Sequence, residues 1–254
     1  MIDQIPKQET NISINLPADF KLSVLMPVYN ERKTVLQVLS SVCALNLPKE
    51  IIIIDDGSID GTRDLLKTTV SDKFPAISVF YHQHNLGKGA AVRTALEYAT
   101  GTICIIQDAD LEYDPSEYYS LLRPILDGRA DAVYGSRFLG RQFFDLPGFW
   151  HYARNVALTL FSNAFTNLKL TDVATGYKVI PTNLLQSLSL RANGFDIDSE
   201  LTVKLARVKA RILEVPISYN GRSYSQGKKI TWKDGFQALW CICRSRVQNP
   251  AETI

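Results

Sequence analysis

Short apolar runs alternate with helix-length segments along the first half of this chain. The runs are typical of β-strands, because they are short, rich in β-branched residues and bounded by turn residues. We expect strands at residues 22–28, 50–55, 77–82, 102–107 and 130–136. We expect helices between them, at residues 33–45, 60–70, 88–100 and 115–127. Continuously apolar strands separated by helices indicate an α/β fold: a Rossmann-like, mostly parallel sheet sandwiched by helices.

The alternation becomes less regular after Phe138. We expect helices at 150–167, 199–208 and 231–247, and strands at 176–180 and 212–217. No repeat or linker interrupts the pattern, so a single domain is expected from residue 22 to residue 250. Residues 1–21 lack the apolar core of a signal peptide and are expected to form an N-terminal arm. No run approaches the roughly 20 apolar residues of a membrane span, so the chain is not expected to cross a bilayer.

An acidic cluster follows the apolar run at 102–107. Asp108, Asp110 and Glu112 occupy alternate positions, and their side chains can converge if the segment is extended. Oxygen ligands without a nearby His or Cys suit a hard divalent cation, Mg²⁺ or Mn²⁺, which usually also binds substrate phosphates. The alternative is a solvated acidic turn in which Asp114 caps the next helix and Pro115 opens it. That alternative accounts for Asp114 but not for the acids before it.

Polar turns also follow the first three strands. The first turn, MPVYNERK, lacks the G-x-G-x-x-G of dinucleotide-binding folds, but Tyr29 can stack on a base beside Glu31. The second, DDGS, places Asp56 where it could accept hydrogen bonds from a nucleoside, although the motif is also an ordinary turn. The third, NLGKGAA, places Lys88 between glycines at a helix N-terminus, which suits a phosphate. Together with the acidic cluster, these turns predict a site for a nucleoside diphosphate and a metal ion.

Charge and cysteine content exclude some classes. The net charge is +2, and no basic tract appears, so we expect no nucleic-acid partner. The cysteines lack zinc-ligand spacing and lie in apolar surroundings, as in a cytosolic protein with reduced thiols. They are Cys43, Cys104, Cys241 and Cys243.

These motifs together resemble the inverting family-2 glycosyltransferases of GT-A fold. VLMPVYNE, IIIDDGSIDGT, NLGKGAA and QDADLEYDP occur in the family's order and spacing. AVYGSRF, TDVATGYKV, GFDIDSEL and EVPISYNGRSYSQGKK are similar to the branch of dolichyl-phosphate mannose synthases and polyisoprenyl-phosphate glycosyltransferases. The resemblance covers residues 22–247. It implies a nucleotide-sugar half at 22–137 and an acceptor half at 138–250.

The resemblance also implies residue roles. The expected nucleotide-binding residues are Pro27, Tyr29, Glu31, Asp56, Lys88 and Asp108. The expected metal ligands are Asp108, Asp110 and Glu112, with Glu112 standing where such synthases often have Gln. The expected catalytic residues are Asp110, Arg222, Lys228 and Asp198, and the acceptor phosphate is expected at Arg137 and Arg154. The segment RSYSQGKK departs from the family's usual R-x-x-G-x-S-K, which leaves the choice of donor open.

The implied activity is metal-dependent, inverting transfer of a hexose from a UDP- or GDP-sugar to a polyprenyl or dolichyl phosphate. A soluble enzyme with a saccharide or small-molecule hydroxyl acceptor is the alternative. It would need a general base, for which Asp198 or Asp196 is available, but Asp198 could equally cap a helix beginning at Ser199. A nucleotidyltransferase would need a Gly-rich, basic first turn, and a non-catalytic nucleotide-sugar sensor could lose the acidic cluster. The first turn, MPVYNERK, is not Gly-rich and basic, and the acidic cluster is present, so the sequence favours neither class.

The C-terminal helix expected at 231–247 carries an apolar stripe. Its members are Trp232, Phe236, Leu239, Trp240 and Cys243. The stripe could pack on the protein's own core, as most amphipathic helices do, or lie in a membrane interface with Arg244 and Arg246 nearby. The expected location is the cytoplasm, because no signal peptide or membrane span is expected. Contact with the cytoplasmic face of a membrane is the open alternative.

Overall fold

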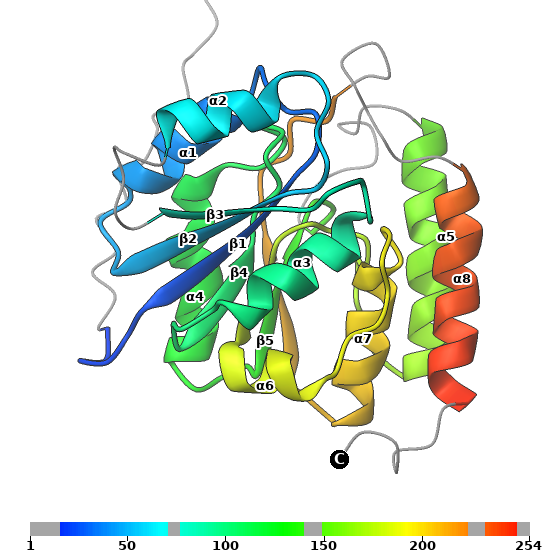
Figure 1. Cartoon of the computed structure of the whole chain (residues 1–254). Helices are drawn as coiled ribbons and strands as arrows, with labels where there is room; N and C mark the ends of the chain where they lie inside the picture. Colours follow the sequence, from blue (N-terminus) through cyan, green and yellow to red (C-terminus); the bar gives the residue numbers. More distant parts are fainter. Residues whose placement is uncertain (1–15, 71–76, 140–148, 223–231, 248–254) are drawn as a thin grey trace, which may run out of the picture.

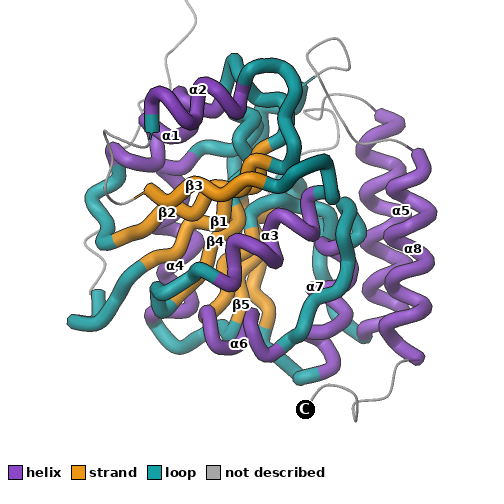
Figure 2. Tube along the Cα trace, viewed as in Figure 1, coloured by secondary structure: helices purple, strands orange, loops and turns teal. Residues whose placement is uncertain are grey.

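The computed structural model describes residues 16–70, 77–139, 149–222 and 232–247 (Figure 1). They form one sheet with helices on both faces, as the sequence predicts (Figure 2). The strands, in chain order, are β1 (Leu22–Val28), β2 (Lys49–Asp55), β3 (Ile77–Tyr81), β4 (Ile103–Ile106), β5 (Ala132–Ser136), β6 (Lys178–Pro181) and β7 (Ile212–Pro216). The predicted mostly parallel α/β sheet is confirmed.

The order of strands in the sheet is β3-β2-β1-β4-β6-β5-β7. β1 pairs in parallel with β2 and β4, and β5 pairs in parallel with β7. β6 is antiparallel to both of its neighbours, β4 and β5. The second half of the chain thus inserts a strand between two strands of the first half. Both of the expected halves, 22–137 and 138–250, therefore contribute strands to one sheet.

The two sheet faces carry separate cores, because successive strand side chains point to opposite faces. One face, with Val24 and Met26, packs on α1 (Val35–Ala44), α2 (Thr62–Thr69) and α4 (Tyr118–Leu126), and the 3₁₀ turn η1 (Pro115–Glu117) contacts α1 and α4. The other, with Leu25 and Ile106, packs on α3 (Lys88–Glu97), α6 (Thr182–Ser187) and α7 (Ile197–Arg207). α5 (Phe149–Thr166) and α8 (Trp232–Val247) lie side by side outside α7 (Figure 1).

Three details differ from the sequence expectations. α6 was not predicted, since a helix of 6 residues carries little periodic signal. α7 begins at Ile197 instead of Ser199. Phe20, expected in a loose arm, is buried against the core, so the folded domain begins before β1. No helix within the described residues has the length and apolar character needed to cross a membrane.

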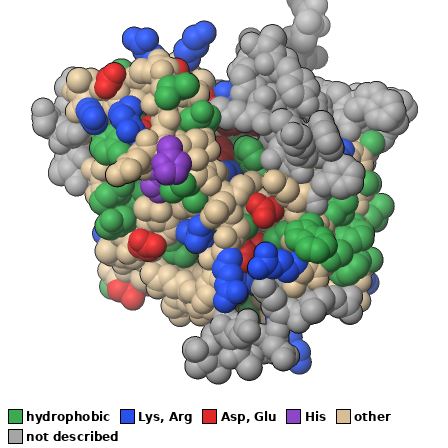
Figure 3. Space-filling model, turned by 45° about the vertical axis from the view of Figure 1, so that its right-hand side comes forward, with side chains coloured by type: hydrophobic (Ala, Val, Ile, Leu, Met, Phe, Trp, Pro, Cys, Tyr) green, Lys and Arg blue, Asp and Glu red, His purple; other side chains and the backbone are tan. Residues whose placement is uncertain are grey.

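The apolar side chains of α8 divide between two environments, and the buried ones lie outside the predicted stripe. Ala238 and Ile242 are buried, Leu239 and Cys243 are half-buried, and Trp240 is 70% exposed. The side chains of Trp232, Phe236 and Arg246 lie outside the described residues. Core packing therefore accounts for one side of α8 only. Leu160 of the neighbouring α5 is also exposed, and Figure 3 shows hydrophobic side chains gathered on this side of the molecule.

Candidate active site

A cavity of about 260 Å³ opens at the carboxyl ends of the central parallel strands. Such an edge is where open α/β sheets bind ligands, because the strand-to-helix turns meet there. The predicted site residues that line it are Pro27, Tyr29, Glu31, Asp56, Lys88, Asp108, Asp110, Glu112, Arg137, Asp198 and Arg222. Arg154, on α5, is not part of this lining, and Lys228 lies outside the described residues. The strand-end turns therefore converge as expected, whereas Arg154 does not join them.

Arg222 is the cation at the centre of the acidic cluster. Its Nη1 and Nη2 atoms donate to the two carboxylate oxygens of Glu31, each at 3.0 Å. Nη2 also donates to Asp110 Oδ2 at 3.0 Å, and the backbone N–H donates to Glu112 Oε1 at 2.8 Å. Tyr219 completes the arrangement, because its hydroxyl donates to Glu112 Oε2 at 2.8 Å. One arginine thus neutralises acids from two turns that are distant in sequence.

A second cation occupies the other end of the cluster. Lys88 Nζ lies 2.8 Å from Asp108 Oδ1 and 3.0 Å from Oδ2. Burial alone would lower the pKa of Lys88, but the carboxylates of Asp108, Asp198 and Asp110 raise it above its usual range. Burial, together with the charges of Asp108 and Glu112, raises the pKa of Asp110 to about 7, against the opposing effect of Arg222. The carboxylates are therefore close enough to repel one another.

The convergence of Asp108, Asp110 and Glu112 on one metal ion stays a prediction, because the protein's own cations hold these carboxylates. Among the described residues, no group of three or more His, Cys, Asp or Glu side chains has the geometry to hold a metal. The reason is that Lys88 holds Asp108 while Arg222 and Tyr219 hold Asp110 and Glu112.

The donor set nevertheless fits Mg²⁺ or Mn²⁺. Mg²⁺ commonly takes one or two carboxylates and completes its coordination with water and substrate phosphates. Asp108 and Asp110 offer such oxygens, and a divalent cation would relieve the repulsion that, after burial, raises the pKa of Asp110. A metal ion here would supply Lewis-acid stabilisation of a leaving diphosphate.

Asp56 holds the turn at Leu86 and Gly87 instead of projecting freely into the cavity. Its Oδ1 accepts from Leu86 N at 2.9 Å and lies 2.7 Å from Nδ1 of His82. Its Oδ2 accepts from Gly87 N at 2.8 Å. The carboxylate therefore fixes the turn that presents Lys88. A side chain at Gly87 would collide with the backbone of Asn193, which explains the glycine.

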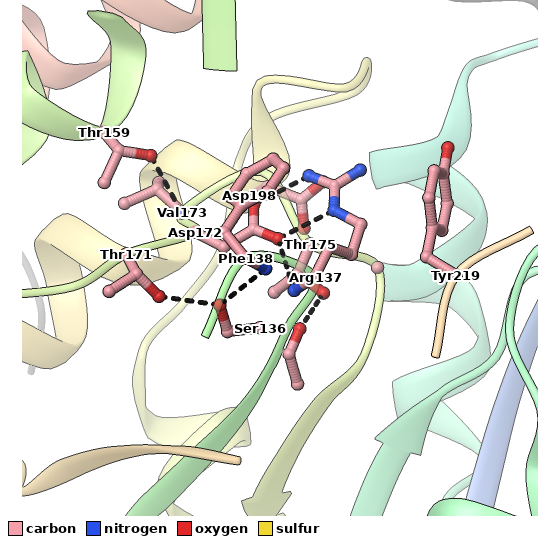
Figure 4. Close-up of polar contacts among 12 residues, drawn as sticks. Ser136, Arg137, Phe138, Thr159, Thr171, Asp172, Val173, Thr175, Asp198 and Tyr219 are labelled. Carbon is pink, nitrogen blue, oxygen red and sulfur yellow. Dashed lines mark hydrogen bonds and ion pairs between the residues drawn. The ribbon is translucent and has the colours of Figure 1, made fainter. Parts of the chain in front are cut away.

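Arg137 is clamped by a residue to which the sequence assigned no role. Its Nε and Nη2 atoms donate to the two oxygens of Asp172, each at 2.7 Å, and the two side chains point toward one another in Figure 4. Glu214 holds this segment in turn, because it accepts from the backbone N–H groups of Thr171 and Asp172. The guanidinium lies 5.1 Å from the ring centroid of Tyr219. The motif TDVATGYKV thus supports a rigid, buried cation at the cavity wall.

Asp198 has a similar buried partner. It lies in the first turn of α7 with Asp196 at the N-cap position, so the alternative of Asp198 as the cap is wrong. Lys178 Nζ, at the start of β6, donates to Asp198 Oδ1 at 2.5 Å. Burial lowers the pKa of Lys178, and Asp198 opposes this effect. A lysine inside the apolar run KVIP was the sequence signal for this pair.

The sequence of this chain is similar to those of known glycosyltransferases. Residues 23–186 match the family described as glycosyl transferase family 2. Glycosyltransferase AglJ of Haloferax volcanii is 28% identical over 82% of this chain and 65% of its own. Dolichol-phosphate mannosyltransferase of Pyrococcus furiosus is 26% identical over 82% of this chain, which spans 59% of that protein. UDP-N-acetylglucosamine--dolichyl-phosphate N-acetylglucosaminyltransferase of Methanococcus voltae is 26% identical, covering 88% of this chain and 95% of its own.

Solved structures support the fold. Glucosyl-3-phosphoglycerate synthase from Mycobacterium tuberculosis, in complex with Mn²⁺, uridine diphosphate and phosphoglyceric acid, superposes with a TM-score of 0.69. It is 20% identical, covering 92% of this chain and 81% of that chain. At this identity the likeness concerns the GT-A fold alone.

Proposed function

The chain belongs to glycosyl transferase family 2 and is a glycosyltransferase; from this premise we propose that it moves a hexose from a nucleotide-sugar to a polyprenyl or dolichyl phosphate. The reaction inverts the anomeric carbon and depends on Mg²⁺ or Mn²⁺. The observation that carries the proposal is the pairing of cations with carboxylates in the cavity. Lys88 pairs with Asp108, and Arg222 pairs with Asp110. Cations and oxygen ligands side by side are what a diphosphate and its metal ion require.

The donor would lie across the strand-end turns. Tyr29 and Pro27 line the cavity on the side of β1, where a base could stack. Lys88 and Arg222 would leave their carboxylate partners for the diphosphate oxygens, which carry more negative charge and accept in more directions. Both side chains would then stabilise the charge that grows on the leaving diphosphate. A uridine or a guanosine diphosphate meets these requirements.

The acceptor would approach the wall formed by Arg137. Asp172 holds its guanidinium through Nε and Nη2, so a phosphate would meet a cation whose orientation is already fixed. A phosphate oxygen is anionic at neutral pH and needs no general base. It would attack the anomeric carbon as the bond from that carbon to the diphosphate oxygen breaks. The relatives from Pyrococcus furiosus and Methanococcus voltae, whose names include dolichol or dolichyl phosphate, support this acceptor.

A donor and acceptor panel tests the proposal. Purified protein would be incubated with UDP-glucose, UDP-N-acetylglucosamine, GDP-mannose and related donors in Mn²⁺, with and without polyprenyl phosphate, and the released nucleotide measured. We expect rapid release from one donor only when the lipid phosphate is present. Transfer to free sugars or small alcohols, with none to polyprenyl phosphate, would replace the lipid acceptor by a hydroxyl acceptor. Absence of transfer from every donor would contradict the proposed activity.

Contact with a membrane gives a second test. Trp240 is 70% exposed on α8, Arg244 is exposed one turn later, and Leu160 is exposed on the adjacent α5. An aromatic and a cationic side chain together suit the interface of an anionic bilayer. We expect Trp240→Ser to reduce co-sedimentation with anionic liposomes while the melting temperature stays unchanged. Ile59→Ser, at an exposed apolar residue in the turn before α2, is the control and should sediment like wild type. Equal sedimentation of both variants would argue against docking through α8.

A further inference from the structure

Lys178 is a fully buried lysine directly behind the cavity. Its side chain has no exposed surface, and its Nζ donates to Asp198 Oδ1 at 2.5 Å and to the backbone oxygen of Thr175. The ammonium also lies 4.9 Å from the ring centroid of Tyr134. A buried charge requires a partner and hydrogen bonds to offset its loss of hydration. A core that needed only packing would be filled more favourably by an apolar residue, so this pair calls for another explanation.

The antiparallel strand β6 explains how a lysine reaches this position. The parallel strands end at the cavity, and β6 runs the other way, so its first residue, Lys178, begins at the same edge. The chain just before it is tightly packed. A side chain at Gly176 would collide with the carboxylate of Asp108, and Gly176 N donates to the hydroxyl of Tyr113 at 2.8 Å. The backbone that carries Lys178 therefore has little freedom to shift.

Asp198 faces the cavity with its other oxygen available. The residue lines the cavity, and its Oδ1 is occupied by Lys178. Within the described part of the chain, Oδ2 has no hydrogen-bond donor. Asp198 and Lys88 both line this cavity, so a ligand held at Lys88 would lie in the same cavity as the open oxygen of Asp198. A carboxylate held at one oxygen and open at the other is arranged to accept a hydrogen bond from a ligand.

We propose that Lys178 is a positioning residue that holds Asp198 so that its Oδ2 accepts a hydrogen bond from a hydroxyl group of the donor sugar. This inference rests on the proposed function, because it needs a nucleotide-sugar in the cavity. It assigns Asp198 to sugar binding and not to proton transfer. If Asp198 took a proton, the buried ammonium of Lys178 would lose its counter-charge, so the pair resists acting as a base. The acceptor oxygen must then arrive already deprotonated.

Calorimetry separates contacts to the sugar from contacts to the nucleotide. Binding of UDP, GDP, UDP-glucose, UDP-N-acetylglucosamine and GDP-mannose would be measured in Mn²⁺ for wild type, Lys178→Met and Asp198→Asn. We expect both variants to lose about tenfold in affinity for the sugar nucleotide that wild type uses, which is one good hydrogen bond to a charged group. Affinity for the bare nucleoside diphosphate should change less than twofold. Lys178→Arg, which retains the charge, should recover part of the loss.

Two further variants control for folding. Lys178→Met/Asp198→Asn removes both charges, which avoids an unpaired buried carboxylate, and should bind the sugar nucleotide no more weakly than either single variant. Lys204→Met breaks a lysine–glutamate pair on the same helix α7, with Lys204 Nζ 2.8 Å from Glu200 Oε1, away from the cavity lining. It should leave both affinities unchanged.

The possible results separate this inference from the proposed function. If wild type binds and transfers the sugar but the folded Lys178 variants keep its affinity, the positioning role is wrong and the proposed function stands. Equal losses for the bare nucleotide and the sugar nucleotide would make Lys178 a structural residue only. If wild type binds no sugar nucleotide, the proposed function and the inference both fail.

Discussion

Replacing Asp110 by asparagine is expected to abolish glycosyl transfer and to weaken Mn²⁺ binding in the presence of the nucleotide. Asp110 lies half-buried between Asp108 and Glu112, and burial together with the charges of these two acids raises its pKa to about 7. Removing one anionic oxygen ligand from a site with few such ligands should matter more than removing an outer contact, which already costs about 10–100-fold in metal affinity. Activity and Mn²⁺ affinity, measured by calorimetry with UDP or GDP present, test this expectation.

Asp114 supplies a matched control for Asp110. It belongs to the same acidic segment, but its carboxylate caps η1 by accepting from Ser116 N at 2.9 Å, and it does not line the cavity. Asp114→Asn should keep activity and metal affinity close to wild type. A fully active Asp110→Asn variant, or wild-type activity that persists in excess chelator, would show that the acidic cluster does not serve a metal ion.

The sequence predicted the parts of the fold that depend on local pattern. The first four strands and their helices follow from apolar runs and turn residues, and parallel pairing follows from their alternation. The position of β6 does not, because pairing between β4 and β5 depends on contacts far apart in the chain. The short helix α6 and the early start of α7 were missed because one or two turns carry little periodicity.

The location of the candidate site could be predicted from the sequence, but its internal contacts could not. The strand-end turns converge at one edge because parallel strands end there, and this places Tyr29, Asp56 and Asp108 together without knowledge of the tertiary structure. The internal ion pairs were not predictable. Arg222 and Glu31 are 191 positions apart, and nothing in either motif indicates the other. The motif TDVATGYKV resembles the family's sequences, but the resemblance does not indicate its contacts. Asp172 of this motif accepts hydrogen bonds from Arg137, and Lys178 donates one to Asp198.

These ion pairs change the interpretation of the acidic cluster. The expected metal site becomes a set of carboxylates already neutralised by the chain's own cations, Lys88 with Asp108 and Arg222 with Asp110. When a metal ion and a diphosphate bind together, the metal ion can replace Lys88 and Arg222 at the carboxylates, and the diphosphate can accept these two cations. A metal ion alone would leave the cations without a partner, and a diphosphate alone would leave the carboxylates without one. Metal and nucleotide are therefore expected to bind cooperatively.

Arg222→Ala tests this exchange, because it removes one internal cation. We expect turnover to fall on the order of 10²–10³-fold, the usual effect of losing a group that stabilises developing charge. We also expect Mn²⁺ to bind more tightly in the absence of nucleotide, since Glu31, Asp110 and Glu112 lose the guanidinium that competes for them. The cooperativity between Mn²⁺ and nucleotide should shrink accordingly. Calorimetric titrations of Mn²⁺, with and without UDP or GDP, measure both effects.

Arg123→Ala is the control for the loss of an arginine. Arg123 pairs with Asp127 at 3.6 Å on the surface of α4, where such pairs contribute little. Its turnover, metal affinity and melting temperature should match wild type.

Arg222→Ala should melt earlier than wild type without metal, because three carboxylates are left to repel one another, and added Mn²⁺ should restore more stability to it than to wild type. If Mn²⁺ affinity stays unchanged and turnover falls only in proportion to unfolded protein, then Arg222 holds the fold together and takes no part in exchanging the carboxylates for the diphosphate.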